Sequence, residues 1–361
     1  MSASGGSVFG GKKVFILILG LSLTAASCDI NALFNGTGGT QGIFRSEDAG
    51  ETFKPANALA KKGDIGGVSA NSLAFDSSNP DNLYLGASNG IFKSTDSAKS
   101  WRYILANIAV ADLAVDPYQS NIIYAAGVSG SNGKIIKSLD GGTSWADIYT
   151  EPSKNNPVLA VAVSSANNQV VLAGLLSGEI IRSVDAGHTW QAAKDFSSKI
   201  SAIVFGPNGT AYALTTLKGL NKSSDLGITW TNLTDSLTGD NFYSSADKPT
   251  SVNGFTNLAL DRKQSGVLYL GTDRGLFRSV NDGGSWSFMA LPVKNASLLV
   301  SAVAVNPGNS NNLFVSIGHI LFKSLNGGVT WETKVMGTNA IIKIIQINSV
   351  SNNIIYVGFG S

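Results

Sequence analysis

The side chains that could do chemistry in this sequence are carboxylates that return at one fixed place in a repeated segment. Each segment, which we call the box, reads basic residue, Ser, any residue, Asp or Asn, any residue, usually Gly, any residue, Ser or Thr, and an aromatic residue. The acidic position holds Asp48, Asp96, Asp140, Asp185, Asp225, Asn281 and Asn326. Carboxylates can bind metals or transfer protons, but residues that occur once per repeat lie far apart and cannot form one site. The repetition therefore predicts a structural role for them.

Other reactive side chains are few. Cys28 is the only Cys, and His188 and His319 are the only His, which excludes a disulfide within the chain and a zinc site built from Cys and His. A Ser-His-Asp triad would have to use one of the two His residues, and the sequence nominates no nucleophile, base and orienting residue that act together. We therefore predict no catalytic residue, no metal and no cofactor, which favours a protein that is not an enzyme.

The N-terminal region has the pattern of a secretory signal. Two lysines precede the apolar run 14–23, and small residues lead from there to Cys28. Ten helical residues rise about 15 Å, too little to cross a bilayer of about 30 Å. The pattern predicts a lipoprotein-type signal peptide over 1–27, lipidation at Cys28 and a tether over 28–41, although Ala25 stands where such signals prefer Leu. We expect secretion and a lipid anchor at a bacterial cell envelope; the alternative is an ordinary secreted protein.

The composition suits a globular β protein. Lys and Arg number 26 against 24 Asp and Glu, so the net charge of +2 offers no basic stripe for nucleic acid. Hydrophobic residues make up 43% of the chain, which is too apolar for a disordered protein. The 41 Gly residues, together with many Asn and Ser, interrupt the chain too often for a helical bundle.

The elements that position the boxes can be read from a second repeated pattern. About midway between boxes, two short apolar runs flank a turn rich in Asn, Pro, Ser and Gly, as in residues 73–86. Two strands from this pattern and one on each side of the box make four antiparallel strands per unit of about 45 residues, which is typical of a propeller blade. The aromatic residue that ends the box should pack across the sheet. These residues are Phe53, Trp101, Trp145, Trp190, Trp230, Trp286 and Trp331.

The count of strands predicts how the ring closes. The last two apolar strands, 341–347 and 353–358, have no third and fourth strand after them, and the first box, 42–53, has no strands before it. Joining the two ends completes a seventh blade and hides two open sheet edges. We therefore predict an all-β, seven-bladed propeller over 42–361, closed by N-terminal outer strands that pair with C-terminal inner strands. A six-bladed ring with leftover strands and an open solenoid are the alternatives.

Within a box, the carboxylate should accept hydrogen bonds from its own turn, and Gly should supply the positive φ that the turn needs. Asn281 and Asn326 keep the acceptor oxygen without the charge, so acceptance matters more than ionisation. The basic residue before each Ser is expected to pair locally; the alternative is a basic band on the outer wall that contacts lipid headgroups or an acidic partner. These basic residues are Arg45, Lys93, Lys137, Arg182, Lys222, Arg278 and Lys323.

These boxes resemble the Asp-box, or BNR, signature, and the resemblance extends over residues 42–361. Sialidases, xyloglucanases, sortilin-type receptors and photosystem II stability/assembly factor-like propellers share it, and the chain is most similar to the last group. That resemblance implies a non-catalytic, envelope-associated binding or assembly scaffold that uses loops on one propeller face. The alternative is a glycoside hydrolase with an unrecognised site. The string 44–47 belongs to a box and not to the Phe-Arg-Ile-Pro motif of sialidases, and xyloglucanases resemble two propellers where this chain has one.

Ligand-binding residues are expected where the chain departs from the repeat, because loops on a rigid scaffold usually carry function. The longest departure, 231–257, contains an aromatic pair with flanking charge, although it could equally be a variable loop. The candidate binding residues are Asp240, Phe242, Tyr243, Asp273, Arg274 and His319, followed by Lys61, Lys62 and Asp64. We expect a protein or glycan ligand at the envelope, membrane contact through the lipid anchor only, no nucleic acid, and a monomer.

Overall fold

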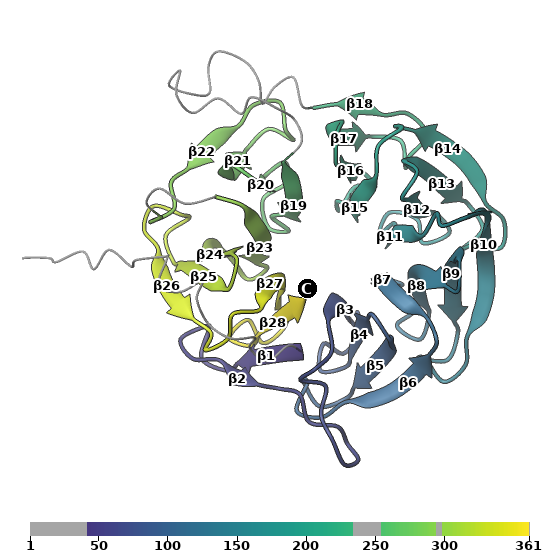
Figure 1. Ribbon diagram of the computed structural model, residues 1–361. Helices are drawn as coiled ribbons and strands as arrows, with labels where there is room; N and C mark the ends of the chain where they lie inside the picture. The colour runs from purple at the N-terminus through teal and green to yellow at the C-terminus, as the bar shows by residue number, and fades with distance from the viewer. Residues whose placement is uncertain (1–41, 234–253, 294–297, 361) are drawn as a thin grey trace, which may run out of the picture.

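The computed structural model describes residues 42–233, 254–293 and 298–360. Over these residues the chain forms seven four-stranded antiparallel sheets arranged in a ring, as Figure 1 shows. The predicted seven-bladed β-propeller is therefore confirmed. The described part of the chain contains no helix with the length and apolar character needed to cross a membrane.

The blades follow one another in chain order, and each begins with its inner strand. Blade 1 consists of β3 (Ala70–Phe75), β4 (Leu83–Ala87), β5 (Gly90–Ser94) and β6 (Arg102–Ala106). Blade 2 consists of β7 (Ala109–Val115), β8 (Ile123–Ser129), β9 (Asn132–Ser138) and β10 (Ala146–Lys154). Blade 3 consists of β11 (Val158–Val163), β12 (Val171–Leu175), β13 (Glu179–Ser183) and β14 (Gln191–Asp195). Blade 4 consists of β15 (Ile200–Phe205), β16 (Ala211–Thr215), β17 (Gly219–Ser223) and β18 (Thr231–Asn232). Blade 5 consists of β19 (Phe255–Leu260), β20 (Leu268–Thr272), β21 (Gly275–Ser279) and β22 (Ser287–Met289). Blade 6 consists of β23 (Val300–Asn306), β24 (Asn309–Ile317), β25 (Ile320–Ser324) and β26 (Glu332–Val335).

The closing blade joins the two ends of the described chain. Its strand order is β27 (Ile341–Ile347), β28 (Ile355–Gly360), β1 (Gly42–Ser46) and β2 (Lys54–Pro55). The register of β1 on β28 runs from Gly42 opposite Phe359 to Ser46 opposite Ile355. The predicted closure is thus confirmed, and these two strands no longer present free backbone edges to other chains.

The second strand is wholly buried in several blades because a neighbouring blade covers each of its faces. All five residues of β4, β12, β16 and β20 are buried, which explains their nearly continuous apolar sequence. Seven hydrophobic clusters form the core, and each one contacts one box aromatic residue. A fully buried Leu, Ile or Phe contributes about 1.5–3 kcal/mol, so the contacts between blades stabilise the ring.

Backbone conformation explains the sequence of the turn inside each box, which we call the box turn. In blade 2 the residues after Asp140 are Gly141 and Gly142, with φ of 69° and 89°. Ser97 and Ala98 adopt the same left-handed conformation in blade 1, with φ of 59° and 64°, at the usual cost for residues with a Cβ. The Gly141 amide donates to the Asn121 carbonyl in the turn between inner and second strands of the same blade (2.9 Å). These two kinds of turn therefore lie at the same end of the blade.

Candidate functional site

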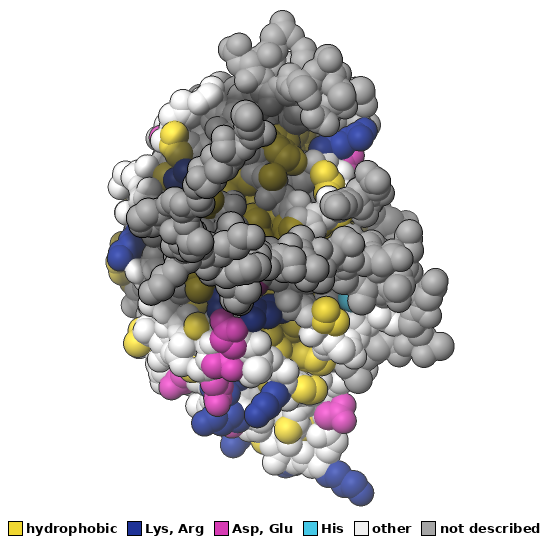
Figure 2. Space-filling view, turned by 90° about the vertical axis from the view of Figure 1, so that its left-hand side faces the viewer, with side chains coloured by type: hydrophobic (Ala, Val, Ile, Leu, Met, Phe, Trp, Pro, Cys, Tyr) yellow, Lys and Arg dark blue, Asp and Glu magenta, His cyan; other side chains and the backbone are white. Residues whose placement is uncertain are grey.

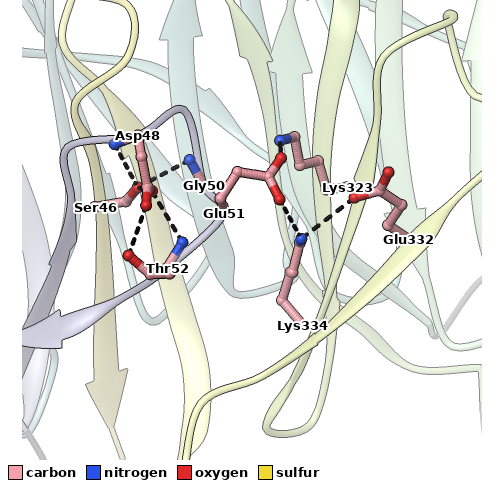
Figure 3. A network of polar contacts seen from close by, with 8 residues as sticks. All are labelled: Ser46, Asp48, Gly50, Glu51, Thr52, Lys323, Glu332 and Lys334. Atoms are coloured by element: carbon pink, nitrogen blue, oxygen red, sulfur yellow. Dashed lines mark hydrogen bonds and ion pairs between the residues drawn. The ribbon is translucent and has the colours of Figure 1, made fainter.

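The first box shows how the repeated carboxylate is used (Figure 3). The Asp48 Oδ1 atom accepts from the Ser46 hydroxyl (2.7 Å) and the Thr52 amide (2.9 Å), and Oδ2 accepts from the Thr52 hydroxyl (2.6 Å). The Gly50 amide in turn donates to the Ser46 Oγ atom (2.8 Å). The carboxylate thus connects the start and the end of its own turn, and its lone pairs are largely used there.

The other boxes repeat this arrangement. Asp140 accepts from Ser144 through the hydroxyl (2.6 Å) and the amide (2.8 Å), and from the Ser138 hydroxyl (2.8 Å). The Ser144 hydroxyl, the Ser144 amide and the Ser138 hydroxyl together lower the pKa of Asp140 to about 2. Asn326 keeps the same acceptor role with Oδ1 and donates from Nδ2 to the Thr330 hydroxyl (2.8 Å). A low pKa and a full set of donors suit an acceptor and not a proton-transferring acid.

For five of the seven boxes the basic residue differs from the expectation of local pairing, whereas Arg45 pairs with Glu47 of its own box as expected. The Lys93 Nζ atom donates to the Gly141 carbonyl of the following box (2.8 Å) and lies 5.2 Å from the ring centre of Tyr84, its cross-strand neighbour. Lys137 and Arg182 reach the following box in the same way, with donor–acceptor distances of 2.8 Å. These side chains therefore connect neighbouring blades. We call the contact region between two neighbouring blades a seam. The sequence could not show this, because the reach depends on the angle between blades.

The seam between blade 6 and the closing blade has a stronger version of the same contact (Figure 3). The Lys323 ammonium, whose side chain is 2% exposed, pairs with the Glu51 carboxylate of the first box. Lys334 donates to the other oxygen of Glu51 (2.7 Å) and also pairs with Glu332 (3.3 Å). Hydrogen bonds from Lys323 and then Lys334 lower the pKa of Glu51. This network holds the N-terminal box against strands almost 300 residues later in the chain.

The box aromatic residues divide into three kinds of environment. Trp101 is fully buried, and its Nε1 atom donates to the Ala56 carbonyl (2.8 Å). The half-buried Trp145, Trp190 and Trp230 each donate to the carbonyl of the Gly three residues earlier, at 3.1–3.2 Å. Phe53 packs against the cluster of the closing blade, and Trp286 and Trp331 pack in those of blades 5 and 6. All seven contribute to the core between blades.

The candidate binding residues are only partly placed by the structure. Asp240, Phe242 and Tyr243 lie outside the described residues, as does Cys28. Asp273 and Arg274 occupy the turn between β20 and β21, where the Asp273 amide donates to the Gly254 carbonyl (2.7 Å) and Arg274 bridges to Leu298. His319 lies in the corresponding turn between β24 and β25, but it is only 3% exposed, and burial lowers its pKa. Asp273 and His319 thus share a type of turn in neighbouring blades, at the end opposite the boxes.

Other polar residues named from the sequence have local roles or exposed positions. His188 is exposed in its box turn, and its Nδ1 atom lies 2.6 Å from the Asp185 carbonyl. Lys61 and Lys62 are exposed in the segment between β2 and β3. This segment folds back on itself through a bridge between Ala58 and Asp64, and packs against blade 1 through Leu59 and Trp101. Within the described ranges, no three His, Cys, Asp or Glu side chains form a group suited to a metal ion.

A cavity of about 490 Å³ lies where the inner strands converge, at the end that carries the box turns. Its walls are mostly apolar side chains of β3, β19, β23 and β27, with Arg262 and Gln346 among the polar groups. Asp76 is the one carboxylate among the described lining residues. Burial opposes ionisation of Asp76, but hydrogen bonds from Asn82 and Ser78 outweigh it and lower the pKa. The cavity suits an apolar or mixed ligand better than acid–base chemistry.

One polar residue of an inner strand, Asp112, makes contacts with both neighbouring blades that the sequence analysis did not predict. Asp112 on β7 accepts from the Ser72 hydroxyl of blade 1 (2.9 Å) and from the Val161 amide of blade 3 (3.0 Å). Asn257 accepts from the Val303 amide at the equivalent place between blades 5 and 6 (3.2 Å). Burial raises the pKa of Asp112 to about 6, because the hydrogen bonds to it compensate only in part for lost hydration. A polar residue within the apolar run 109–115 was the available signal.

The outer wall carries charges of both signs. Figure 2 shows the flank formed by the closing blade and blades 5 and 6, where acidic and basic side chains lie next to one another among hydrophobic ones. The ion pairs of Glu51 with Lys323 and Lys334 belong to this region. Where the described side chains are visible on this flank, acidic and basic residues occur together, which differs from the basic band that the sequence left open.

Comparison with known proteins places this fold among both enzymes and binding proteins. No protein-family model matches the chain. A xyloglucanase of Hypocrea jecorina (strain QM6a) is 29% identical over 153 residues, which cover 37% of this chain and 17% of that enzyme. The GH74 xyloglucanase of Xanthomonas campestris has a similar structure, with a TM-score of 0.66 and 17% identity over 81% of this chain and 51% of the enzyme. A structure of YCF48 bound to a D1 peptide is similar with a TM-score of 0.62 and 15% identity, over 84% of this chain and 96% of YCF48.

These comparisons establish the architecture. The chain spans about a sixth of the curated xyloglucanase and about half of the Xanthomonas enzyme, but nearly the whole of YCF48. At 15–17% identity the structural similarity concerns the fold, which hosts unrelated functions in different proteins.

Proposed function

We propose that this protein is a non-catalytic scaffold that binds a segment of another protein. The observation that carries the proposal is the cavity of about 490 Å³, whose lining residues are mostly apolar while its exposed surface is about equally polar and apolar, with a single described carboxylate, Asp76, that its own turn already occupies. Such a surface can hold a peptide but offers no free pair of carboxylates for glycoside hydrolysis. The peptide-bound YCF48 structure, 96% of which is covered by the similarity, supports the choice of a peptide ligand.

The proposal is tested by filling the cavity. Ala74 lines it, so Ala74→Trp should weaken binding of a peptide from an array of extended sequences by tenfold or more. Ala146→Trp, at the exposed start of β10 in another part of the ring, is the matched control and should leave binding within twofold. Equal affinities for the two variants, with both folded by circular dichroism, would remove the cavity from the binding function.

A glycoside hydrolase is the second candidate, favoured by one observation in the structure. Asp112 has a pKa of about 6, which lies in the range of a general acid, and the chain is 29% identical to part of a xyloglucanase. Incubation of the full chain with xyloglucan, followed by measurement of reducing ends, tests this function. Release of oligosaccharides that is lost in Asp112→Asn would establish it, whereas no release at high enzyme concentration would leave the scaffold as the function.

We further propose that the scaffold is secreted and held at a bacterial envelope by a lipid on Cys28. The support is the signal-like sequence before this residue. Mass spectrometry of the N-terminus should find Cys28 as the first residue, with the added mass of acyl chains. Cys28→Ser should move the protein from the membrane fraction to the soluble fraction. An unmodified N-terminus that begins elsewhere would refute the anchor.

A further inference from the structure

The seam between the closing blade and blade 1 differs from its neighbours. In five of the other six seams the basic side chain reaches the following box, as Lys93 does at Gly141 and Lys323 at Glu51. Arg278 is the exception among the described residues: it lies over the Tyr269 ring, and its Nε atom is buried. Arg45 instead pairs through Nη1 with Glu47 of its own box. Its Nε atom is buried and has no hydrogen-bond partner within the described part of the chain. Because Nε is buried, a ligand in the cavity would use the Nη1 donor that Glu47 now holds.

A cavity of about 480 Å³ lies at this seam. It is bounded by the box turn of the closing blade, by β2 and by the box turn of blade 1. Its charged lining residues are Arg45, Glu47, Asp48, Lys54 and Lys99. The volume falls in the range of about 300–1,000 Å³ that is usual for small-ligand sites.

The charges in this cavity favour an anion. Asp48 accepts from Ser46 and Thr52 and is not available to a ligand, which leaves three cations and Glu47. The pKa of Glu47 is lowered by Arg45 first and then by Lys99 and Lys54, so all three cations act on the same point. The Glu47 side chain is 64% exposed and can rotate away, whereas the Arg45 side chain is only 11% exposed and stays in place.

We propose that this cavity binds a carboxylate of an acidic protein segment, which takes the place of Glu47 on Arg45. Lys54 and Lys99, both exposed at the rim, attract the acidic segment, and Arg45 supplies paired N–H donors of the geometry that carboxylates prefer. Glu47 is then an internal competitor that keeps Arg45 neutralised when the cavity is empty. The inference rests on the proposed scaffold function and assigns it a second, electrostatic contact site.

The test uses the full chain and a fluorescein-labelled, N-acetylated and C-amidated hexapeptide that contains three Glu. The double variant Lys54→Glu/Lys99→Glu should weaken binding at least tenfold. Glu47→Gln, which removes the competitor, should strengthen binding about threefold. Lys154→Glu, an exposed lysine of β10 in blade 2, is the matched control and should stay within twofold. Binding should also weaken as NaCl is raised from about 50 to 300 mM, because the contact is between charges at the surface.

Further arms identify the source of the carboxylate. A neutral hexapeptide with a free C-terminus that binds with the same dependence on the variants would show that a chain end is recognised, while a Gln version of the acidic probe should not bind. The proposal is overturned if the double variant and the control bind alike, or if a phosphoserine peptide or vesicles of anionic lipid bind tenfold more tightly than the acidic probe. If Ala74→Trp blocks peptide binding but Lys54→Glu/Lys99→Glu does not, the result supports the scaffold function and refutes the carboxylate site at the seam.

Discussion

The ion pair between Glu51 and Lys323 offers the sharpest test of how the ring stays closed. Lys323 is 2% exposed, so Glu51→Ala leaves a buried ammonium without its anionic partner. Loss of a hydrogen bond to a charged group costs about 1.5–3 kcal/mol. Glu51 is 50% exposed, and water screens part of the interaction, so we expect a loss of about 2 kcal/mol in the free energy of unfolding. Equilibrium urea unfolding, followed by tryptophan fluorescence, measures this value.

Two controls separate the buried cation from a general loss of charge. Asp147→Ala breaks the ion pair with Lys134 inside blade 2, where the lysine is 24% exposed, and should cost less than about 1 kcal/mol. Lys323→Met removes the buried cation itself, so adding Glu51→Ala to it should cost only the more exposed contact with Lys334, less than about 1 kcal/mol. Glu51→Ala and Asp147→Ala with equal effects, or additive effects of Glu51→Ala and Lys323→Met, would refute the reasoning.

Three further perturbations have expected outcomes. Burial raises the folded-state pKa of Asp112 from 3.8 to about 6, so its contribution to stability is full below pH 4 and is lost as the pH rises through 6. The wild-type protein should therefore lose up to about 3 kcal/mol of unfolding free energy over this range, and Asp112→Asn should not. Urea unfolding at pH 4.5 and 7.5 measures the difference. Lys93→Met removes the bond to Gly141 and should lower the free energy of unfolding by about 1–2 kcal/mol, with faster amide exchange in the box turn of blade 2 as the local readout. Because the pKa of Asp140 is lowered from 3.8 to about 2, its stabilisation is present above pH 4 and is lost as the pH falls through 2. At pH 7, Asp140→Ala should lower the melting temperature more than Asp140→Asn does, because Asn keeps the acceptor oxygen.

The number and order of blades could be predicted because they are encoded locally. Each box sets a reversal through its own side chains, and each apolar run has the length of one strand, so periodicity gives the blade count. Closure could be predicted in the same way. The segment 341–358 supplies only the two inner strands of a blade, and the segment 42–53 supplies its two outer strands. Contacts within one turn, such as those of Asp140, were likewise accessible from residue types alone.

Contacts between blades were not accessible in the same way. The sequence shows that a basic residue precedes each Ser, but whether its amine ends in its own turn or in the next blade depends on the packing angle. The polar character of Asp112 was visible, but its acceptance of bonds from both neighbouring blades depends on the inward direction of β7. His319 looked like a loop residue, and it is buried because its turn packs against the closing blade through Gly318 and Ile342.

The two seams of the closing blade are held by different contacts. One seam is held by Glu51 with Lys323 and Lys334, a contact that spans almost the whole described chain. The other lacks a reach from Arg45 to the next box and contains the cavity instead. This seam is also held by Trp101 of blade 1, which is fully buried and donates to the Ala56 carbonyl. A ligand that engages Arg45 would then add to the closure of the ring, since binding to the folded state alone stabilises it by mass action. If the proposed site binds a carboxylate, ligand binding and ring closure would be coupled through the same blade.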